Sequence, residues 1–437
     1  MQILGLFVPF FCNCKFTLFF SFLDNANNKK IDLFGIKFRT NLQKTENQQN
    51  KKTPFTLLNA LLTKMAPKKQ KKSRPKSQPL PEVTLEQVSL FDDNLQLYHE
   101  QLKDIAAARE YVYLETFRFN DDAMGERFVK ALAEKARQGV KVRVLVDAWG
   151  TRQKFSFFDP IIKAGGEVRA FKKLILTLNF ISDNHRRDHR KILVIDNRIA
   201  YIGSANITAY SLSWRELNLR IADPMARLFQ KVFNDNYVIY NRLDLDKLRF
   251  KRDINYYQMS IIQEIPSRAR QRLARRYESI IGNAKKEVII ETPYFLPSPR
   301  LRKALTAAVQ RGVKVTVISP LKSDVQTADI VRRHTLGALY HSGVVMKFYT
   351  PGNLHAKCLM ADGEVFSISS ANFDFRSFQH QHELALIGRN KQIAALLDEH
   401  LRQTLQNCVD FNYEEWSNRS RFERAVEWIL FPLRFLM

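Results

Sequence analysis

Cysteine is scarce in this chain of 437 residues, which contains only Cys12, Cys14, Cys358 and Cys408. These four form neither a disulfide framework nor a zinc-binding spacing. A reducing compartment therefore fits the chain better than an oxidising one. The sequence also lacks a cluster of Asp, Glu and His with metal-ligand spacing, so we expect no metal and no other cofactor.

Acidic residues are also few. The chain has 44 Asp and Glu against 69 Lys and Arg, which leaves a net charge of +25 and a pI near 9.9. Such an excess of positive charge indicates an acidic partner, which can be nucleic acid, an anionic membrane surface or a phosphate substrate. An apolar content of 45% is enough for a folded core, and the length suits two domains.

Residues 1–83 form a leader that holds fifteen Lys and Arg against four Asp and Glu. Residues 3–23 are apolar and long enough for a membrane anchor, although Pro9 and Lys15 interrupt them and no basic segment precedes them. The alternative is that residues 1–64 are not native structure and that Met65 is a fresh start. The basic, proline-containing run that follows is either a solvated tail or a segment attracted to anionic lipid.

From residue 84 onward the sequence repeats itself, and we expect two copies of one unit, at 84–245 and 246–410, before a tail at 411–437. Four segments recur in the same order in both copies. The matched pairs are 107–116 with 284–292, 137–142 with 310–315, 189–191 with 355–357, and 204–206 with 370–372.

Each copy alternates apolar strands with amphipathic helices, which predicts an α/β fold whose sheets are covered on both faces. In the first copy we expect strands at 111–119, 140–146, 192–195, 199–202 and 217–221, with helices at 126–138 and 225–240. In the second copy we expect strands at 287–292, 313–319, 358–360 and 383–387, with helices at 301–310 and 392–405.

Each copy also carries a His-x-Lys motif just before a buried strand. Side chains two apart on a strand point the same way, so His189 and Lys191 project together, as do His355 and Lys357. Asp196 and Asp362 follow as the acidic members of the two motifs. Each is an odd number of residues from its histidine and should face the other way, so we predict a structural or supporting role for it.

Further polar residues follow each motif at matched positions. Ser204 and Asn206, with Ser370 and Asn372, can present hydroxyl and amide donors to an oxyanion or phosphate. Downstream, one glutamate opens a strand in each copy. The carboxylates of Glu216 and Glu383 are therefore candidates for holding a histidine by its second nitrogen, which fixes the tautomer.

This set of residues suits transfer of a phosphodiester. Lysines and neutral donors stabilise the charge on the non-bridging oxygens. One histidine can attack phosphorus to form a covalent intermediate, while the other protonates the leaving alcohol and then deprotonates the incoming one. Three other histidines, His185, His380 and His382, have no partner in the repeat and are expected to line a pocket or lie on the surface. Cys358 is expected to be packed.

The two motifs resemble the phospholipase D superfamily signature, HxKxxxxD followed by a GSxN-like segment, over most of residues 84–437. Several details are similar to bacterial cardiolipin synthases: 184–187 before His189, 291–297, and 370–374 with Arg376 and Ser377. One departure is Ser369, where the motif usually has glycine and where the first copy keeps Gly203. The resemblance implies two tandem phospholipase D-like α/β/α repeats, packed pseudo-twofold around one active-site cleft.

The resemblance also implies transfer of a phosphatidyl group between two phosphatidylglycerol molecules with release of glycerol. By analogy with the family, His189 would be the nucleophile and His355 the acid and base, although the near symmetry leaves the assignment open. The alternatives are a phospholipase D hydrolase, a metal-independent endonuclease, and a non-catalytic membrane-binding protein. Asp196 and Asp362 argue against tyrosyl-DNA phosphodiesterases, whose motif lacks that residue.

The tail supports a lipid partner over nucleic acid, because it mixes aromatic, aliphatic and basic residues as a membrane interface requires. Its alternative is a helix docked on the core. We therefore expect an enzyme associated with the membrane, at its cytoplasmic face, with anionic phospholipid as substrate. No basic groove with interleaved aromatic residues points to nucleic acid.

Overall fold

The computed structural model describes residues 81–151, 153–171, 185–239, 253–267 and 269–435. Residues 77–437 form one compact unit, and the structure below is that of this unit. The predicted leader up to residue 80, the boundary at residues 245 and 246, and Cys12 and Cys14 lie outside the described residues.

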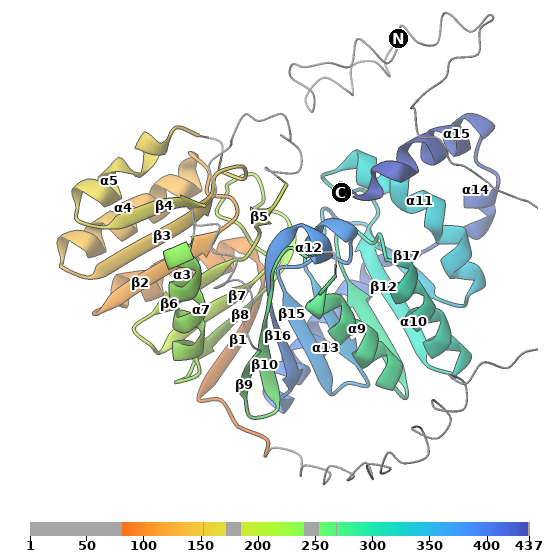
Figure 1. The fold of residues 1–437 in the computed structure, drawn as a ribbon, viewed down its shortest axis with the longest axis horizontal. Helices are drawn as coiled ribbons and strands as arrows, with labels where there is room; N and C mark the ends of the chain where they lie inside the picture. Colours follow the sequence, from red (N-terminus) through yellow and green to blue (C-terminus); the bar gives the residue numbers. More distant parts are fainter. Residues whose placement is uncertain (1–80, 152, 172–184, 240–252, 268, 436–437) are drawn as a thin grey trace, which may run out of the picture. The chain divides into compact units, whose positions relative to one another are not determined.

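The first repeat is drawn in orange to green in Figure 1. Its strands are β1 (Gln87–Asp93), β2 (Tyr111–Thr116), β3 (Lys141–Asp147), β4 (Glu167–Phe171), β5 (Arg187–Asp188), β6 (Ile192–Ile195), β7 (Ile199–Gly203) and β8 (Arg215–Ala222). Its helices are α3 (Asn94–Ala107), α4 (Ala123–Arg137), α5 (Asp159–Lys163) and α7 (Ala226–Ile239), with a short 3-10 turn η2 (Phe155–Phe158).

The second repeat continues in green to blue. Its strands are β9 (Ile254–Tyr256), β10 (Met259–Glu264), β11 (Glu287–Glu291), β12 (Lys314–Pro320), β13 (Val345–Tyr349), β14 (Cys358–Ala361), β15 (Val365–Ser369), β16 (Gln381–Arg389) and β17 (Cys408–Asp410). Its helices are α9 (Arg272–Asn283), α10 (Pro299–Gln310), α11 (Gln326–His341), α12 (Phe375–Gln379) and α13 (Lys391–Gln406).

The two sheets share one strand order, which confirms the predicted duplication. The first runs β1-β8-β7-β6-β2-β3-β4. The second contains the same path as β10-β16-β15-β14-β11-β12-β13, extended by β9 at one end and β17 at the other. Both sheets are mixed, with parallel pairing from β2 through β4 and from β11 through β13. The predicted strand at 111–119 ends earlier, at Thr116, whose hydroxyl donates to the Arg118 carbonyl. Within the two repeats, the sequence interpretation missed strands β1, β4, β5, β9, β10, β13, β15 and β17 and helices α3, α5, α9, α11 and α12.

The repeated segments at 137–142 and 310–315 mark the end of a helix and the start of a strand. Helix α4 is capped by Asp122, whose side chain accepts from two backbone N–H groups, and α10 is capped by Ser298, whose side chain accepts from the Leu301 N–H. Both helices end before a glycine in the left-handed region, Gly139 at φ 84° and Gly312 at φ 85°. A residue without Cβ adopts this conformation readily, so the chain can turn directly into the next strand.

Strand β6 shows how the core holds the two repeats together. Ile192 and Val194 lie in a cluster shared between the repeats, whereas Leu193 and Ile195 lie in a cluster of the first repeat alone. This is the period of two expected for a strand buried on both faces. The shared cluster also contains residues of β14, β15 and β16, so the rigid support of the motifs in both repeats is one apolar core.

The tail at 411–437 forms α14 (Tyr413–Ser417), α15 (Arg421–Leu430) and a final 3-10 turn η3 (Phe431–Phe435). One side of it docks on the second repeat. Trp416 packs against Gly337 of α11, and Arg419 forms a buried ion pair with Glu427 at 2.9 Å. Within the part of the chain that the structure describes, no helix is long and apolar enough to span a bilayer.

Candidate active site

The site is assembled by short β-pairings between the repeats. Strand β5 pairs in parallel with the start of β16, which places Asp188 beside His382. The next residue, His189, donates its backbone N–H to the His382 carbonyl at 2.9 Å. This register brings the His189 ring beside Glu383, and Nδ1 lies 3.0 Å from Oε1 and 3.1 Å from Oε2.

The second histidine is held by the same arrangement in reverse. Leu354 pairs with Arg215 at the start of β8, and the His355 N–H donates to the Arg215 carbonyl at 2.7 Å. His355 Nδ1 then lies 2.8 Å from Glu216 Oε1. The structure thus forms the glutamate contacts predicted from sequence but crosses them, because each histidine is held by the glutamate of the other repeat.

The two lysines of the motifs are buried and have matching contacts. Lys191 Nζ donates to the His189 carbonyl and Lys357 Nζ to the His355 carbonyl, each at 2.6 Å. Burial lowers the pKa of Lys191 to about 7 and that of Lys357 to about 8. A buried ammonium group without an anion is unfavourable, so these lysines suit a site that is completed by a phosphate.

The pKa values of the two histidines are also lowered, which favours the neutral imidazole ring. Burial lowers the pKa of both. Around His189 the charges of Lys191, Lys357, His355 and Arg376 lower it further, whereas around His355 the Glu216 carboxylate opposes the shift. Burial raises the pKa of Glu383 to about 7, against the effect of the two lysines and of Ser370.

The two motif aspartates lie at the far ends of the strands that the histidines precede. Asp196 accepts from the backbone N–H groups of Arg109, Glu110 and Tyr111 at 2.7–2.9 Å. Asp362 makes the same contacts with 285–287 at 2.7–3.1 Å. These contacts fit the structural role predicted from the odd offset, and they correct the grouping of the two carboxylates with the catalytic residues.

The serines also need a correction, because both hydroxyl groups are already engaged. Ser204 Oγ donates to the Leu217 carbonyl at 3.2 Å, and Ser370 Oγ donates to Glu383 at 2.5 Å. They hold neighbouring groups rather than an oxyanion.

The asparagines that follow the serines keep polar atoms available. Asn206 uses Oδ1 to accept from the Arg118 N–H at 3.2 Å. Asn372 Oδ1 has no hydrogen-bond partner among the described residues. A phosphate oxygen would accept from the Nδ2 amide groups of these asparagines and not from Oδ1, so the donors to be tested as phosphate ligands are Asn206 Nδ2 and Asn372 Nδ2.

Sequence reasoning missed a layer of buried charge beneath the site. Glu115 and Asp188 form ion pairs with Arg190 at 2.9 and 2.8 Å. At the position of Glu115 in the second repeat, Glu291 instead accepts from His400 Nε2 at 2.8 Å. Glu115 and Glu291 occupy matching positions in the repeated segments 107–116 and 284–292, and this match could have identified them from the sequence.

Two aromatic residues that were also missed pack on the histidines. The edges of Phe117 and Trp214 contact His189 and His355, with ring centroids 5.1 and 5.3 Å apart. These rings contribute to the burial of the two histidines, which are 7% and 6% exposed.

The remaining predicted residues are placed as follows. His185 and His380 form a ring contact at 4.6 Å, His382 packs against Phe171, and Cys358 is fully buried as predicted. Among the described residues, no group of three or more His, Cys, Asp or Glu side chains is arranged to hold a metal ion.

Two repeats that exchange His–Glu contacts over a pair of buried lysines define an enzyme of phospholipase D type. The family model described as "Cardiolipin synthase, PLD-like domain" matches residues 102–237 and 277–405, once in each repeat. The chain belongs to this family.

Individual relatives agree with the assignment. The cardiolipin synthase of Listeria welshimeri is 32% identical over 364 residues, with 79% of this chain and 75% of the relative covered. That of Clostridium perfringens strain SM101 is 29% identical, with 78% and 75% covered. The crystal structure of phosphatidylserine synthase from Haemophilus influenzae matches with a TM-score of 0.64 and 13% identity, covering 82% of this chain and 95% of that one. The last likeness concerns the fold alone.

Proposed function

We propose that the protein is a phosphatidyltransferase of the cardiolipin synthase type. It moves a phosphatidyl group from one phosphatidylglycerol molecule to another and releases glycerol. The observation that carries this proposal is the crossed arrangement of the histidines, with His189 on Glu383 and His355 on Glu216, inside a chain of the cardiolipin synthase family. Each glutamate engages Nδ1, which leaves Nε2 as the reacting nitrogen.

In the first step, His189 Nε2 attacks phosphorus and the bond from phosphorus to the glycerol oxygen breaks. His355 gives its proton to that oxygen, and glycerol leaves. In the second step, the now neutral His355 removes a proton from a hydroxyl of a second phosphatidylglycerol. The resulting oxygen attacks phosphorus, the bond to His189 breaks, and cardiolipin is released.

The charges around the two histidines support this division of roles. A nucleophilic imidazole must be neutral, and burial together with four cationic groups holds the pKa of His189 well below its usual value. A general acid must carry a proton, and although burial lowers the pKa of His355 as well, the Glu216 carboxylate opposes that shift. Lys191 and Lys357, with Asn206 and Asn372, stabilise the non-bridging oxygens.

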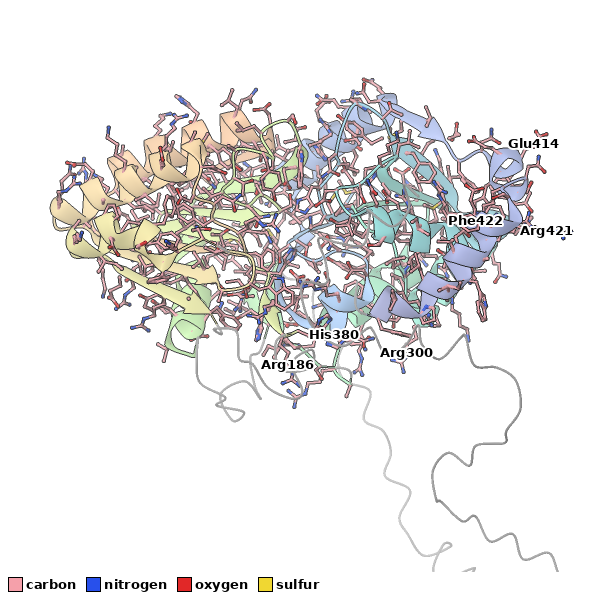
Figure 2. All side chains as sticks on the ribbon, turned by 90° about the horizontal axis from the view of Figure 1, so that it is seen from above. Arg186, Arg300, His380, Glu414, Arg421 and Phe422 are labelled. Carbon is pink, nitrogen blue, oxygen red and sulfur yellow. The ribbon has the colours of Figure 1, made fainter. Side chains whose placement is uncertain are left out.

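We propose that the tail brings this site to the membrane. Phe422, Trp428 and Ile429 of α15 are 63%, 72% and 63% exposed, beside the exposed Arg421 and Arg424. Exposed aromatic and aliphatic side chains among arginines suit an anionic lipid surface better than water. Figure 2 shows Arg421 and Phe422 at the outer edge of the second repeat.

The tail also reaches toward the site. Phe435 of η3 contacts Phe375 of α12 with ring centroids 4.9 Å apart, and α12 leads directly into β16, which carries Glu383. We propose that the substrate is an anionic phospholipid at a membrane surface, and the cytoplasmic face expected from the sequence stays a prediction. Nucleic acid is not the proposed partner.

The function is tested by incubating the purified full chain with phosphatidylglycerol vesicles in EDTA and following the lipids by mass spectrometry. We expect cardiolipin and free glycerol, and neither with His189→Ala or His355→Ala. Phosphatidic acid as the product would indicate a hydrolase, and cleavage of DNA without lipid turnover would indicate a nuclease.

Membrane contact is tested by flotation with phosphatidylglycerol vesicles and with phosphatidylcholine vesicles. The triple variant Phe422→Ser, Trp428→Ser, Ile429→Ser should lose binding to the anionic vesicles. The matched control is Leu95→Ser, which alters a residue 58% exposed on α3 of the first repeat and should float as the wild type does. Equal flotation of all three proteins would exclude the tail as the membrane contact.

A further inference from the structure

The two repeats differ at one position next to the site. Gly203 ends β7 and lies opposite Asn218 of β8, whereas Ser369 ends β15 and lies opposite Ala385 of β16. Only one member of each pair carries a polar side chain. A Cβ at position 203 would lie 2.4 Å from Asn218 Oδ1, so the first repeat has no room for a serine there.

In both pairs the polar side chain accepts a hydrogen bond from the equivalent backbone N–H group. In the second repeat, Ser369 Oγ accepts from the Ala371 N–H at 2.9 Å and donates to the Leu384 carbonyl at 3.1 Å. In the first repeat, Asn218 Oδ1 accepts from the Ala205 N–H at 3.2 Å. The asparagine cannot reproduce the second function of the serine, because its oxygen has no proton to donate.

The serine that follows in each repeat also has a different hydrogen-bond acceptor. Ser204 Oγ donates to the Leu217 carbonyl at 3.2 Å. Ser370 Oγ instead donates to Glu383 at 2.5 Å and lies 3.4 Å from the Leu384 carbonyl, which already accepts from the preceding serine. A hydroxyl group has one proton, so it can serve the carbonyl or the carboxylate but not both at full strength.

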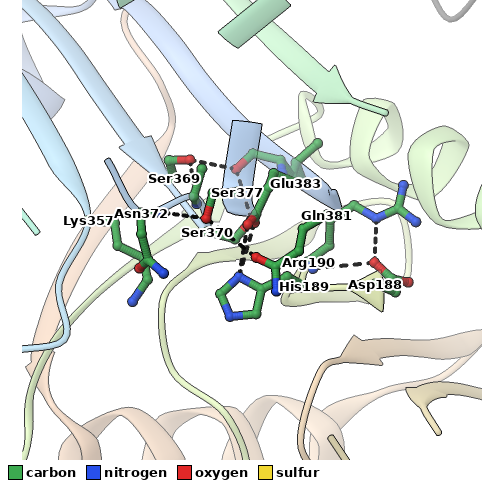
Figure 3. Close-up of polar contacts among 12 residues, drawn as sticks. Asp188, His189, Arg190, Lys357, Ser369, Ser370, Asn372, Ser377, Gln381 and Glu383 are labelled. Carbon is green, nitrogen blue, oxygen red and sulfur yellow. Dashed lines mark hydrogen bonds and ion pairs between the residues drawn. The ribbon is translucent and has the colours of Figure 1, made fainter. Parts of the chain in front are cut away.

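The two histidine-holding carboxylates are consequently unequal. Glu383 accepts from Ser370 and contacts His189 with both oxygens. When the Gln381 amide is oriented so that its oxygen accepts from the Arg376 guanidinium, its nitrogen donates to Glu383 at 3.0 Å. Glu216 contacts His355 with Oε1 alone, and its Oε2 has no hydrogen-bond partner among the described residues. Figure 3 shows the Ser370, Glu383 and His189 contacts converging.

We propose that Ser369 is a positioning residue that makes the two histidines unequal. By occupying the Leu384 carbonyl, it turns the Ser370 hydroxyl onto Glu383. A donor on the carboxylate reduces the negative charge facing His189, which weakens the Nδ1–H contact and favours the neutral ring. The serine that departs from the family motif thus biases His189 toward the nucleophilic form.

Other charged groups face His189 as well, namely Lys191, Lys357, His355 and Arg376. All four disfavour the protonated ring. Of these residues, Lys357 accepts through its backbone carbonyl from the Ser369 N–H at 3.1 Å, and a change of the Ser369 side chain does not remove this backbone bond. A change at Ser369 therefore leaves this background in place and acts on His189 through the serine and Glu383.

The proposal is tested by NMR on the full chain labelled with ¹⁵N-histidine. The Nδ1–H resonances of His189 and His355 are assigned from His189→Gln and His355→Gln spectra. In Ser369→Ala, the Ser370 hydroxyl is free to return to the Leu384 carbonyl, as Ser204 does in the first repeat. The His189 resonance should then move downfield, as expected for a stronger bond to Glu383, while that of His355 stays in place.

A second variant separates this effect from loosening of the fold. Ser370→Ala should displace the His189 resonance in the same direction, and adding Ser369→Ala to it should produce no further displacement. The proposal is overturned if the His189 resonance does not move in Ser369→Ala, if both histidine resonances move together, or if the two substitutions act additively.

The catalytic consequence rests on the proposed function and has its own readout. A nucleophile that binds a proton more tightly loses activity at a higher pH as the pH falls. The acid limb of the kcat/KM profile for cardiolipin formation should therefore move to higher pH in Ser369→Ala. Absence of lipid turnover by the wild type would overturn the proposed function and leave the NMR result as the test of Ser369.

Discussion

Glu216 of the first repeat lies 2.8 Å from Nδ1 of His355 in the second, and the reciprocal contact joins Glu383 to His189. Neither repeat alone contains both members of a pair formed by a motif histidine and the glutamate that holds it. The site therefore exists only when β8 and β16 are brought against the segments that precede the two histidines. Duplication here produces one site that contains both motif histidines rather than two separate copies of a site.

Replacing Glu216 by glutamine keeps the side chain's shape and removes its charge. We expect Glu216→Gln to lower kcat for cardiolipin formation by about 10²- to 10⁴-fold, because the tautomer and the protonated form of His355 lose their support. Glu414→Gln, on the exposed α14, is the matched control. Combining Glu216→Gln with His355→Ala should be no worse than His355→Ala alone, and additive losses would show that the glutamate acts elsewhere.

Binding of an anion should depend on the lysines. The pKa of Lys191 is about 7 and that of Lys357 about 8, so both lose their charge as the pH rises through this range. We expect the affinity for tungstate, a phosphate mimic, to fall between pH 7 and 9 when measured by calorimetry. An affinity that stays constant from pH 6 to 9 would mean that the lysines are charged throughout or do not contact the anion.

The same burial predicts a trade-off between stability and function. Lys191→Met should abolish turnover yet stabilise the unliganded protein by on the order of 1–2 kcal/mol at pH 6, because a buried charge is replaced by an apolar chain of similar size. The folded-state pKa of about 7 lies below the ordinary 10.5, so the unfolded state binds more protons between these values.

The wild type should consequently gain stability relative to the variant as the pH rises from 7 toward 10. Urea unfolding at several pH values measures the gap. A gap that widens with pH would contradict the lowered pKa.

Substitution of the motif aspartates should affect folding more than chemistry. Asp362→Ala removes an acceptor shared by three backbone N–H groups and places alanine at φ 55°. We expect a loss of about 1–3 kcal/mol in unfolding free energy. Below the unfolding temperature, kcat should change less than tenfold, and Asp196→Ala should behave alike. A large loss of kcat in a fully folded variant would assign these carboxylates to the reaction after all.

Much of the molecule followed from the sequence alone. Local periodicity in the sequence predicted the repeat, the strand at 192–195 and the helices around it. The structure has these elements within a few residues of the predicted bounds. The pairing of His189 with Lys191, and of His355 with Lys357, follows from the two-residue period of a strand end. The odd offset of Asp196 and Asp362 was likewise enough to place them away from the histidines.

Other features required the tertiary structure. Which glutamate holds which histidine depends on β5 pairing with β16, a contact between residues 194 positions apart that leaves no trace in local pattern. From the sequence, the serine hydroxyl groups were expected to be available to a ligand. In the structure, the position of the carbonyl groups on the neighbouring strand determines where each hydroxyl donates its single proton. Charge is decided in the same way. A lysine in a sequence is taken as a cation, and only the tertiary structure shows that burial lowers the pKa of Lys191 to about 7.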